Sequence, residues 1–364
     1  MGFSLSNILE DAARGAQQFF TAYDETLTRT QMVTGMTRDE VMSLTSAYAE
    51  LADELSSTIS AVAEAQLVFY QQGLSTEDSL AMTEASVAIS KTGGIEAGEA
   101  ADRLTAAVNG YQLAASDAMD IADKMSALDA AAASSVDELT VAMQKSASQA
   151  RMAGLDLDYY MAYLSTMQEV TREAPENIGT AMKSITSRIQ EITDIGKVEE
   201  DGTTFSNVAE ALNSIGIAAL DTQGQLRPLQ EILNELGPMW ANLDRNHQAY
   251  IATVLAGNRQ QSRFIALMDN YDRALQLVDI SQNSTGESAR QLRAYDEGLE
   301  SSLIGLQNAW QQFATSLVDS DMIKTVVDAL TSLIEVVNAI PDGLLRIVAG
   351  LAAVSAAYKT ISAI

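Results

Sequence analysis

The chain has no cysteine in 364 residues, which excludes disulfide bonds, thiolate catalysis and cysteine-ligated metals. It has one histidine, His247, so metal sites built from several histidines are excluded as well. The neighbours of His247, residues 245–250, indicate a helix start rather than part of a Ser-His-Asp arrangement. The His-Glu-x-x-His motif of zinc peptidases is missing. The sequence therefore predicts no enzyme, no catalytic residues, no metal and no cofactor.

Proline and aromatic residues are also scarce. There are 4 prolines and 21 glycines, aromatic side chains make up 5% of the chain, and the hydrophobic content is nevertheless 47%. The apolar residues are therefore mainly alanine, leucine, isoleucine, valine and methionine, which favours closely packed helices. The sequence predicts an all-α fold, a multi-helix bundle of short helices flanked by long amphipathic helices, with one minor β-ribbon near 217–227.

Basic residues are few. Lysine and arginine number 22 against 49 acidic residues, giving a net charge of −27. Binding to nucleic acid needs lysine and arginine to replace the counterions of the phosphates. The sequence therefore predicts no stable nucleic-acid binding. Its N-terminus also lacks the basic region and apolar core of a secretory signal.

Residues 37–70 are predicted to form one long helix. Thr37 and Glu40 have the spacing of a capping box, and Gly73 is placed to end the helix. Between them, apolar residues recur at steps of mostly three and four: Val41, Leu44, Tyr48, Leu51, Leu55, Ile59, Val62 and Phe69. At ~1.5 Å per residue the helix would be a rod of about 45 Å.

Shorter helices are expected after Gly73, because the same kinds of start and stop signal recur. Ser75 precedes Asp78 by three residues, and Ser135 precedes Glu138 by three, while Gly94 and Gly154 are placed to end helices. The spacing of these signals is not constant, so the chain is not predicted to be a solenoid.

The polar segment 196–207 is predicted to be a loop at a subdomain boundary. A second long amphipathic helix is expected from about residue 287. The predicted organisation is therefore an N-terminal helical segment, a first and a second part of a helical core, a long amphipathic helix and an apolar segment: residues 1–36, 37–195, 208–286, 287–320 and 321–364.

The apolar end of the chain carries only Arg346 and Lys359 as charges between residues 343 and 364. Its uncharged run, 347–358, is shorter than the ~20 residues of a clean membrane span. Membrane contact through 322–364 is nevertheless expected from its composition. Because the sequence stops inside an apolar pattern, we expect it to be part of a longer protein.

Three other groups of charged residues are candidate sites with simpler explanations. Residues 199–201 and the pair Asp156 and Asp158 could bind calcium or act in acid–base chemistry, but a solvated loop and a helix start explain them better. Arg259 and Arg263 could clamp an anion, or they form the polar face of a helix with a buried side made of Phe264, Leu267 and Met268.

The most specific feature is residues 169–195, a predicted amphipathic helix with Pro175 at its first position and a regular apolar stripe: Ile178, Met182, Ile185, Ile189 and Ile192. Further blocks lie before and after it: 71–75, 100–110, 124–130, Gly154-Leu155, 215–228, Trp240 and 251–268. In this order they resemble the core region of phage tail tape-measure proteins over roughly residues 37–286.

The resemblance implies a structural protein of the virion that occupies the tail tube, sets tail length and leaves ahead of the DNA. The partners it implies are the tail tube protein, the tail-tip or initiator complex, assembly chaperones and further copies in a trimer or hexamer. It implies the host cytoplasm during assembly, and residues 322–364 add the host inner membrane during infection. A membrane-active protein, either pore-forming or a secreted effector, is the alternative. Because the helices are short and interrupted, we expect a folded region, with the extended ruler elsewhere.

Overall fold

The computed structural model describes residues 21–190, 205–296, 304–305 and 308. Within these ranges the regular elements are helices and none is a strand, which confirms the predicted all-α fold. The chain forms two compact units. The first contains residues 1–63 and 299–364, and the second contains residues 64–298. Each unit is described separately below.

The prediction of one long helix over residues 37–70 is wrong. The segment forms three helices: α2 (Arg38–Ser43), α3 (Thr45–Glu54) and α4 (Ile59–Gln71). The main break lies between α3 and α4. Ser56 there has a φ of 48°, which a continuing helix does not allow, and the hydroxyl of Thr58 accepts the N–H of Ala61 at 3.2 Å. Serine and threonine hydroxyls compete with helical hydrogen bonds in this way. The predicted rod is therefore absent.

The local signals at the starts and ends of helices are confirmed. Thr37 and Glu40 form the capping box of α2, and Ser135 and Glu138 form that of α8 (Val136–Met152). Gly94 ends α5 (Thr76–Gly93) in the left-handed conformation, at a φ of 64°. The first described helix covers residues 21–34, and its Tyr23 hydroxyl lies 3.0 Å from the Thr45 hydroxyl of α3.

The second unit continues from α4 through a series of short helices. In chain order these are α5 (Thr76–Gly93), α6 (Ala97–Tyr111), η1 (Ala115–Asp117), α7 (Ala118–Ala131), α8 (Val136–Met152), α9 (Leu157–Thr171), α10 (Pro175–Gln190), α11 (Phe205–Ser214), α12 (Leu229–Trp240), α13 (Arg245–Ala256), α14 (Gln261–Asp269), α15 (Tyr271–Gln282) and α16 (Glu287–Asp296).

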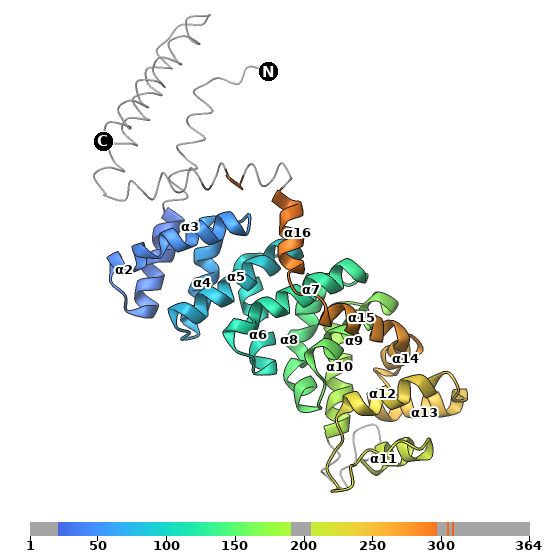
Figure 1. The fold of residues 1–364 in the computed structure, drawn as a ribbon. Coiled ribbons are helices and arrows are strands. Elements are labelled where there is room, and N and C mark those ends of the chain that lie inside the picture. The colour runs from blue at the N-terminus through green and yellow to red at the C-terminus, as the bar shows by residue number, and fades with distance from the viewer. Residues whose placement is uncertain (1–20, 191–204, 297–303, 306–307, 309–364) are drawn as a thin grey trace, which may run out of the picture. The chain divides into compact units, whose positions relative to one another are not determined.

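The chain of the second unit folds back on itself. Helix α8 packs between α6 and α10, and α14 and α15 pack on α9. From there the orange helices in Figure 1 run back along the green ones, α15 beside α7 and α16 beside α7 and α5. The last helix of the unit therefore lies beside the first helix that belongs wholly to it.

The core consists of aliphatic side chains with a few large aromatic ones. Trp240, Tyr160, Tyr163 and Phe264 are almost completely buried, and the Trp240 and Phe264 rings meet edge to face with centroids 5.9 Å apart. Many methionines also lie in the core: Met82, Met125, Met143, Met161, Met167, Met182 and Met268.

The minor β-ribbon expected near residues 217–227 is reduced to one isolated antiparallel bridge between Leu220 and Leu226. The turn that joins them is held by Asp221, whose carboxylate accepts the N–H groups of Gln223 and Gln225, both at 2.8 Å. The side chain therefore closes the turn without a strand pair on either side.

Several expectations fall on residues that the structure does not describe. They include the acidic loop 199–201, the long helix 287–320 beyond the last residue of α16, and the apolar segment 321–364. The expected subdomain boundaries stay predictions, although α11 already begins at Phe205, inside the predicted loop 196–207. In the described part of the chain, no helix is long and apolar enough to cross a membrane.

Candidate functional site: cross-links between the helices

Helix α10 carries the segment with the most specific resemblance. Pro175 is its first residue, as predicted, and Ile178, Met182, Ile185 and Ile189 are at most 1% exposed. The helix lies against α8 at a close crossing. A Cβ on Gly179 would stand 2.5 Å from the carbonyl oxygen of Ala142, so only glycine permits this approach. The apolar stripe is therefore a packed core face.

Helix α10 also contacts the block at residues 251–268. The hydroxyl of Ser184 donates to the carbonyl oxygen of Ala256 at 2.9 Å. Beside it, the Arg188 guanidinium covers Gly257, where a Cβ would stand 2.8 Å from the nearest nitrogen. Gly257 also has a φ of 76°, which favours glycine. Two blocks that are far apart in the sequence thus meet in one packed junction.

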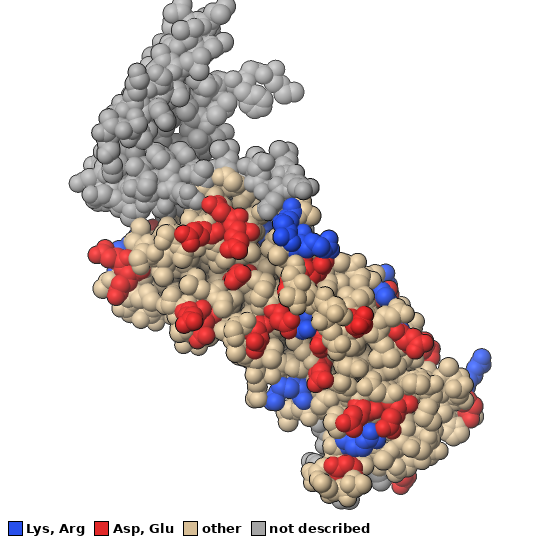
Figure 2. Space-filling model, viewed as in Figure 1, with Lys and Arg blue, Asp and Glu red and all other residues tan. Residues whose placement is uncertain are grey.

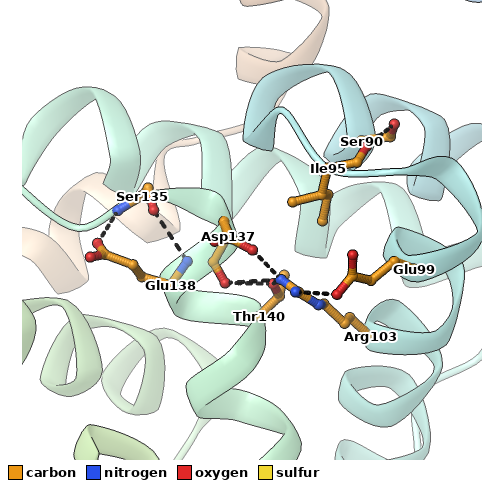
Figure 3. A network of polar contacts seen from close by, with 8 residues as sticks. All are labelled: Ser90, Ile95, Glu99, Arg103, Ser135, Asp137, Glu138 and Thr140. Atoms are coloured by element: carbon orange, nitrogen blue, oxygen red, sulfur yellow. Dashed lines mark hydrogen bonds and ion pairs between the residues drawn. The ribbon is translucent and has the colours of Figure 1, made fainter. Parts of the chain in front are cut away.

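Arg103, from the block at 100–110, ties α6 to the first turn of α8 (Figure 3). Its guanidinium donates to the Asp137 carboxylate, to the Thr140 hydroxyl at 3.0 Å and to the Glu99 carboxylate at 2.5 Å. Burial opposes its charge, but the hydrogen bonds to Asp137 and Glu99 outweigh this and raise the Arg103 pKa. The arginine therefore acts as a fixed cation that clamps two helices.

The middle of helix α7 is buried on all sides, since every residue from 121 to 128 is buried. Two of these residues, Asp123 and Lys124, carry charges, and a buried charge needs partners. Lys124 Nζ lies 2.8 Å from the Asp158 carboxylate of α9 and 3.4 Å from the carbonyl oxygen of Ser281 in α15. The Ser281 hydroxyl donates to the same Asp158 oxygen at 2.5 Å.

Asp123 holds the start of α16. Its two carboxylate oxygens accept the N–H groups of Gly286, at 2.7 Å, and Ser288, at 2.9 Å. The first N–H groups of a helix have no partners within the helix, and a negative charge near them is favourable. Ser126 adds a hydroxyl contact to Ser288 at 3.1 Å. We call Asp123, Lys124 and Ser126, with the residues they bind in α9, α15 and α16, the α7 anchor.

The structure describes two of the three candidate sites predicted from the sequence, the pair Asp156 and Asp158 and the pair Arg259 and Arg263. Asp156 precedes α9, and Asp158 pairs with Lys124, so these two acids form a helix start and an ion pair rather than a calcium site. In the described ranges, no group of three or more acidic, histidine or cysteine side chains could hold a metal ion.

Arg259 and Arg263 do not act together as a clamp. Arg263 is paired with Glu173 beside the start of α10, whereas Arg259 is exposed in the turn before α14 rather than on the helix itself. Phe264, Leu267 and Met268 are buried, as the structural interpretation predicted.

His247 lies at a helix start, as its neighbours predicted. Asp244 precedes α13, and one of its carboxylate oxygens accepts the N–H groups of Asn246 and His247. The other oxygen lies 2.6 Å from His247 Nδ1. These hydrogen bonds, the His247 contact first among them, lower the Asp244 pKa. The aspartate therefore works as a helix cap.

Sequence reasoning missed Asp123. The available signal was an acid and a base placed next to each other among small and apolar residues in the middle of a predicted helix. The face of the molecule in Figure 2 carries more acidic than basic side chains. Several basic side chains form ion pairs with acids of another segment: Arg103, Lys124, Arg263 and Arg273.

The sequence is similar to those of known proteins. A family model described as phage-related minor tail protein matches residues 49–257. The tape measure protein of Pneumococcus phage Dp-1 is 19% identical over 87% of the chain and 27% of its own length. The probable tape measure protein of Escherichia phage P2 is 22% identical over 79% of the chain and 35% of its own length. The chain thus spans only about a third of these relatives, and no solved structure matches it.

Proposed function

Because the chain belongs to the phage-related minor tail protein family, we propose that residues 37–286 are the folded core of a tape-measure protein in a phage tail. The resemblance predicted from the sequence is confirmed by the family match and by the two tape-measure relatives. They support a structural role. The expectation that the chain is not an enzyme agrees with that role.

The observation that carries this proposal is that residues of the sequence blocks resembling tape-measure proteins hold the helices together. Their residues join helices to one another, through the α8–α10 crossing, the Arg103 clamp and the α7 anchor. The function of this region is then to present a stable folded body within a longer tail protein. The extended ruler lies in other parts of that protein.

The same proposal includes the partners and the location. The folded core assembles in the host cytoplasm with chaperones, the tail-tip complex and the tail tube protein, and it resides in the tail of the virion in three or six copies. The acidic surface supports the view that the core does not bind DNA stably, since it offers few cations to the phosphates.

The test is tail assembly in a phage whose tail gene encodes this chain. Replacing Ile185 and Ile189 by aspartate places two charges on a face that is at most 1% exposed. Burying an unpaired charge costs several kcal/mol, so the core should not fold and tails should be lost. Lys183→Asp is the matched control, because Lys183 is exposed on the same helix. Electron microscopy gives tail yield and length. Normal tails from the double variant would contradict the proposal.

The ruler role needs a second variant. An in-frame deletion in an extended helical part of the full-length protein should shorten tails by ~1.5 Å for each residue removed. Tails of full length after this deletion would contradict the tape-measure function, but they would not contradict the folded core.

A further inference from the structure

The first unit is built from two segments that are far apart in the sequence. Asn308 is 1% exposed, and its amide nitrogen donates to the carboxylate of Asp53 at 3.1 Å and to the carbonyl oxygen of Ser57 at 2.8 Å. Asp53 lies near the end of α3, and Ser57 lies in the break before α4. The chain therefore leaves this contact after Ser57 and returns to it at Asn308. We call this contact the Asn308 clasp.

The second unit has the same property on its own. Its exit helix α16 packs beside α5, the first helix that lies wholly within the unit. The α7 anchor holds it there, since Asp123 accepts the N–H groups at the start of α16 and Gln291 donates to the carbonyl oxygen of Ser126 at 2.7 Å. A hydroxyl contact between Ser126 and Thr92 of α5, at 3.5 Å, continues the series. The Asn308 clasp thus joins the ends of the chain between Ser57 and Asn308. Independently, the α7 anchor holds the last helix of the second unit near its first helices.

We propose that residues 58–307 remain a closed loop in the tail and add no length to the extended ruler. This inference rests on the proposed tape-measure function. About 250 residues in one continuous helix would span about 375 Å at ~1.5 Å each. In the closed loop, the residues that flank them are joined by a hydrogen bond of 2.8 Å. Tail length would then depend only on residues outside the loop.

The clasp favours closure because both partners of the buried Asn308 amide nitrogen lie in the other segment. Separating the two segments would exchange these hydrogen bonds for hydrogen bonds to water, and the net stabilisation that they give would be lost.

Closure can be tested on the purified 364-residue chain. Because the chain has no cysteine, Glu54→Cys and Gly305→Cys create the only two thiols, and both positions are exposed. A Cβ on Gly305 meets no atom within 4 Å, and neither substitution replaces a clasp residue. A short bismaleimide should link the two cysteines in high yield. Adding Asn308→Leu, which removes both hydrogen bonds, should lower the yield several-fold with the helical circular dichroism unchanged. Equal low yields in both proteins would overturn the closed loop.

Length neutrality is tested in the tail. The turn at Gln223 and Gly224 is exposed, so it is a suitable place for an insertion of about 21 helix-forming residues. We expect tails of unchanged length, whereas a stretched loop would lengthen them by up to about 32 Å at ~1.5 Å per residue. Lengthened tails would overturn the inference. The cross-linking result stands whether or not the insertion variant assembles tails.

The ruler deletion described above separates the two hypotheses. If that deletion shortens tails and the insertion lengthens them, the tape-measure function stands and the closed loop is wrong. If the deletion leaves tail length unchanged while the cross-link forms, the loop is closed but the chain does not belong to a ruler.

Discussion

The α8–α10 crossing and the α7 anchor hold helices together by opposite means. At the crossing, a glycine and a stripe of apolar side chains let two helices approach until backbone meets backbone. At the anchor, a buried acid and a buried base bind the starts and ends of helices that lie more than a hundred residues later in the chain. The first contact depends on shape, and the second depends on paired charges.

The difference shows that neighbouring and distant helices of this fold are held by different kinds of contact. Helices that are close in the sequence pack through apolar faces, which amphipathic periodicity provides directly. The helices that return along the first half, α15 and α16, have α7 as their neighbour, and the residues that fix them there include Asp123, Lys124 and Ser126. Charges inside a helix core fix one arrangement because every other arrangement would leave them unpaired. Three predictions test this contrast.

The largest effect is expected at Lys124. Its side chain is 10% exposed and pairs with Asp158, which is 21% exposed. Lys124→Ala would leave that acid without its cation, and breaking a buried pair in this way costs about 3 kcal/mol or more. Lys124→Met keeps most of the side-chain volume but still leaves the acid unpaired. Lys124→Met combined with Asp158→Leu removes both charges and should recover much of the stability.

Urea unfolding followed by circular dichroism measures these differences. The comparison is between Lys124→Ala and the double variant that lacks both Lys124 and Asp158. If the two proteins unfold at the same urea concentration, this part of the anchor does not act through paired charges. The contrast with the α8–α10 crossing would then fail.

Two glycines, Gly179 at the crossing and Gly98 in α6, should respond to alanine with opposite signs. A Cβ on Gly179 would meet backbone atoms of Ala142 at 2.5 and 3.0 Å, so Gly179→Ala must push the helices apart and should cost about 1–3 kcal/mol. Gly98, in the first turn of α6, has no atom within 4 Å of that position. There alanine should stabilise by roughly 0.5 kcal/mol, because it restricts the unfolded chain. Thermal unfolding gives both signs, and a stabilised Gly179→Ala variant would disprove the close crossing.

The same contrast explains what could be predicted from the sequence. The stripe of α10 and the capping box at Ser135 depend on residues within one helix, so their spacing was sufficient. The break between α3 and α4 was missed because the apolar stripe continues across it, through Leu55 and Ile59, while the hydroxyl-rich residues between them interrupt the helix.

Asp123 could not be predicted as a cap because its partner, Gly286, lies 163 residues away. No local pattern connects the two. The closing contact of Asn308 with Ser57 is of the same kind, since it depends on a fold-back that periodicity does not encode. Local chemistry therefore predicted the helical fold and several helix starts and ends, whereas the long-range pairing of the helices required the structure.

The smallest effect at neutral pH is expected where the two kinds of contact meet, at Tyr271 of α15. Its ring lies over Gly237, and its hydroxyl lies 2.9 Å from that of Tyr163 and donates to Asn234 at 2.5 Å. Tyr271→Phe removes these hydrogen bonds and keeps the ring, so it should cost about 1 kcal/mol at pH 7.

Alkaline pH should change the size of that loss. Burial is the main cause that raises the pKa of Tyr271 from 10.0 to about 12. Between these values the unfolded chain loses the tyrosine proton and the folded chain keeps it, so this contribution to stability is complete below pH 10 and is lost as the pH rises towards 12. The phenylalanine variant lacks that ionisation. Its stability deficit relative to the parent should therefore shrink between pH 10 and 12, as measured by urea unfolding at each pH. Tyr250→Phe, at a side chain that is 46% exposed, controls for the loss of a phenol. A deficit that stays constant or grows with pH would show that the Tyr271 hydroxyl is not buried between α9, α12 and α15.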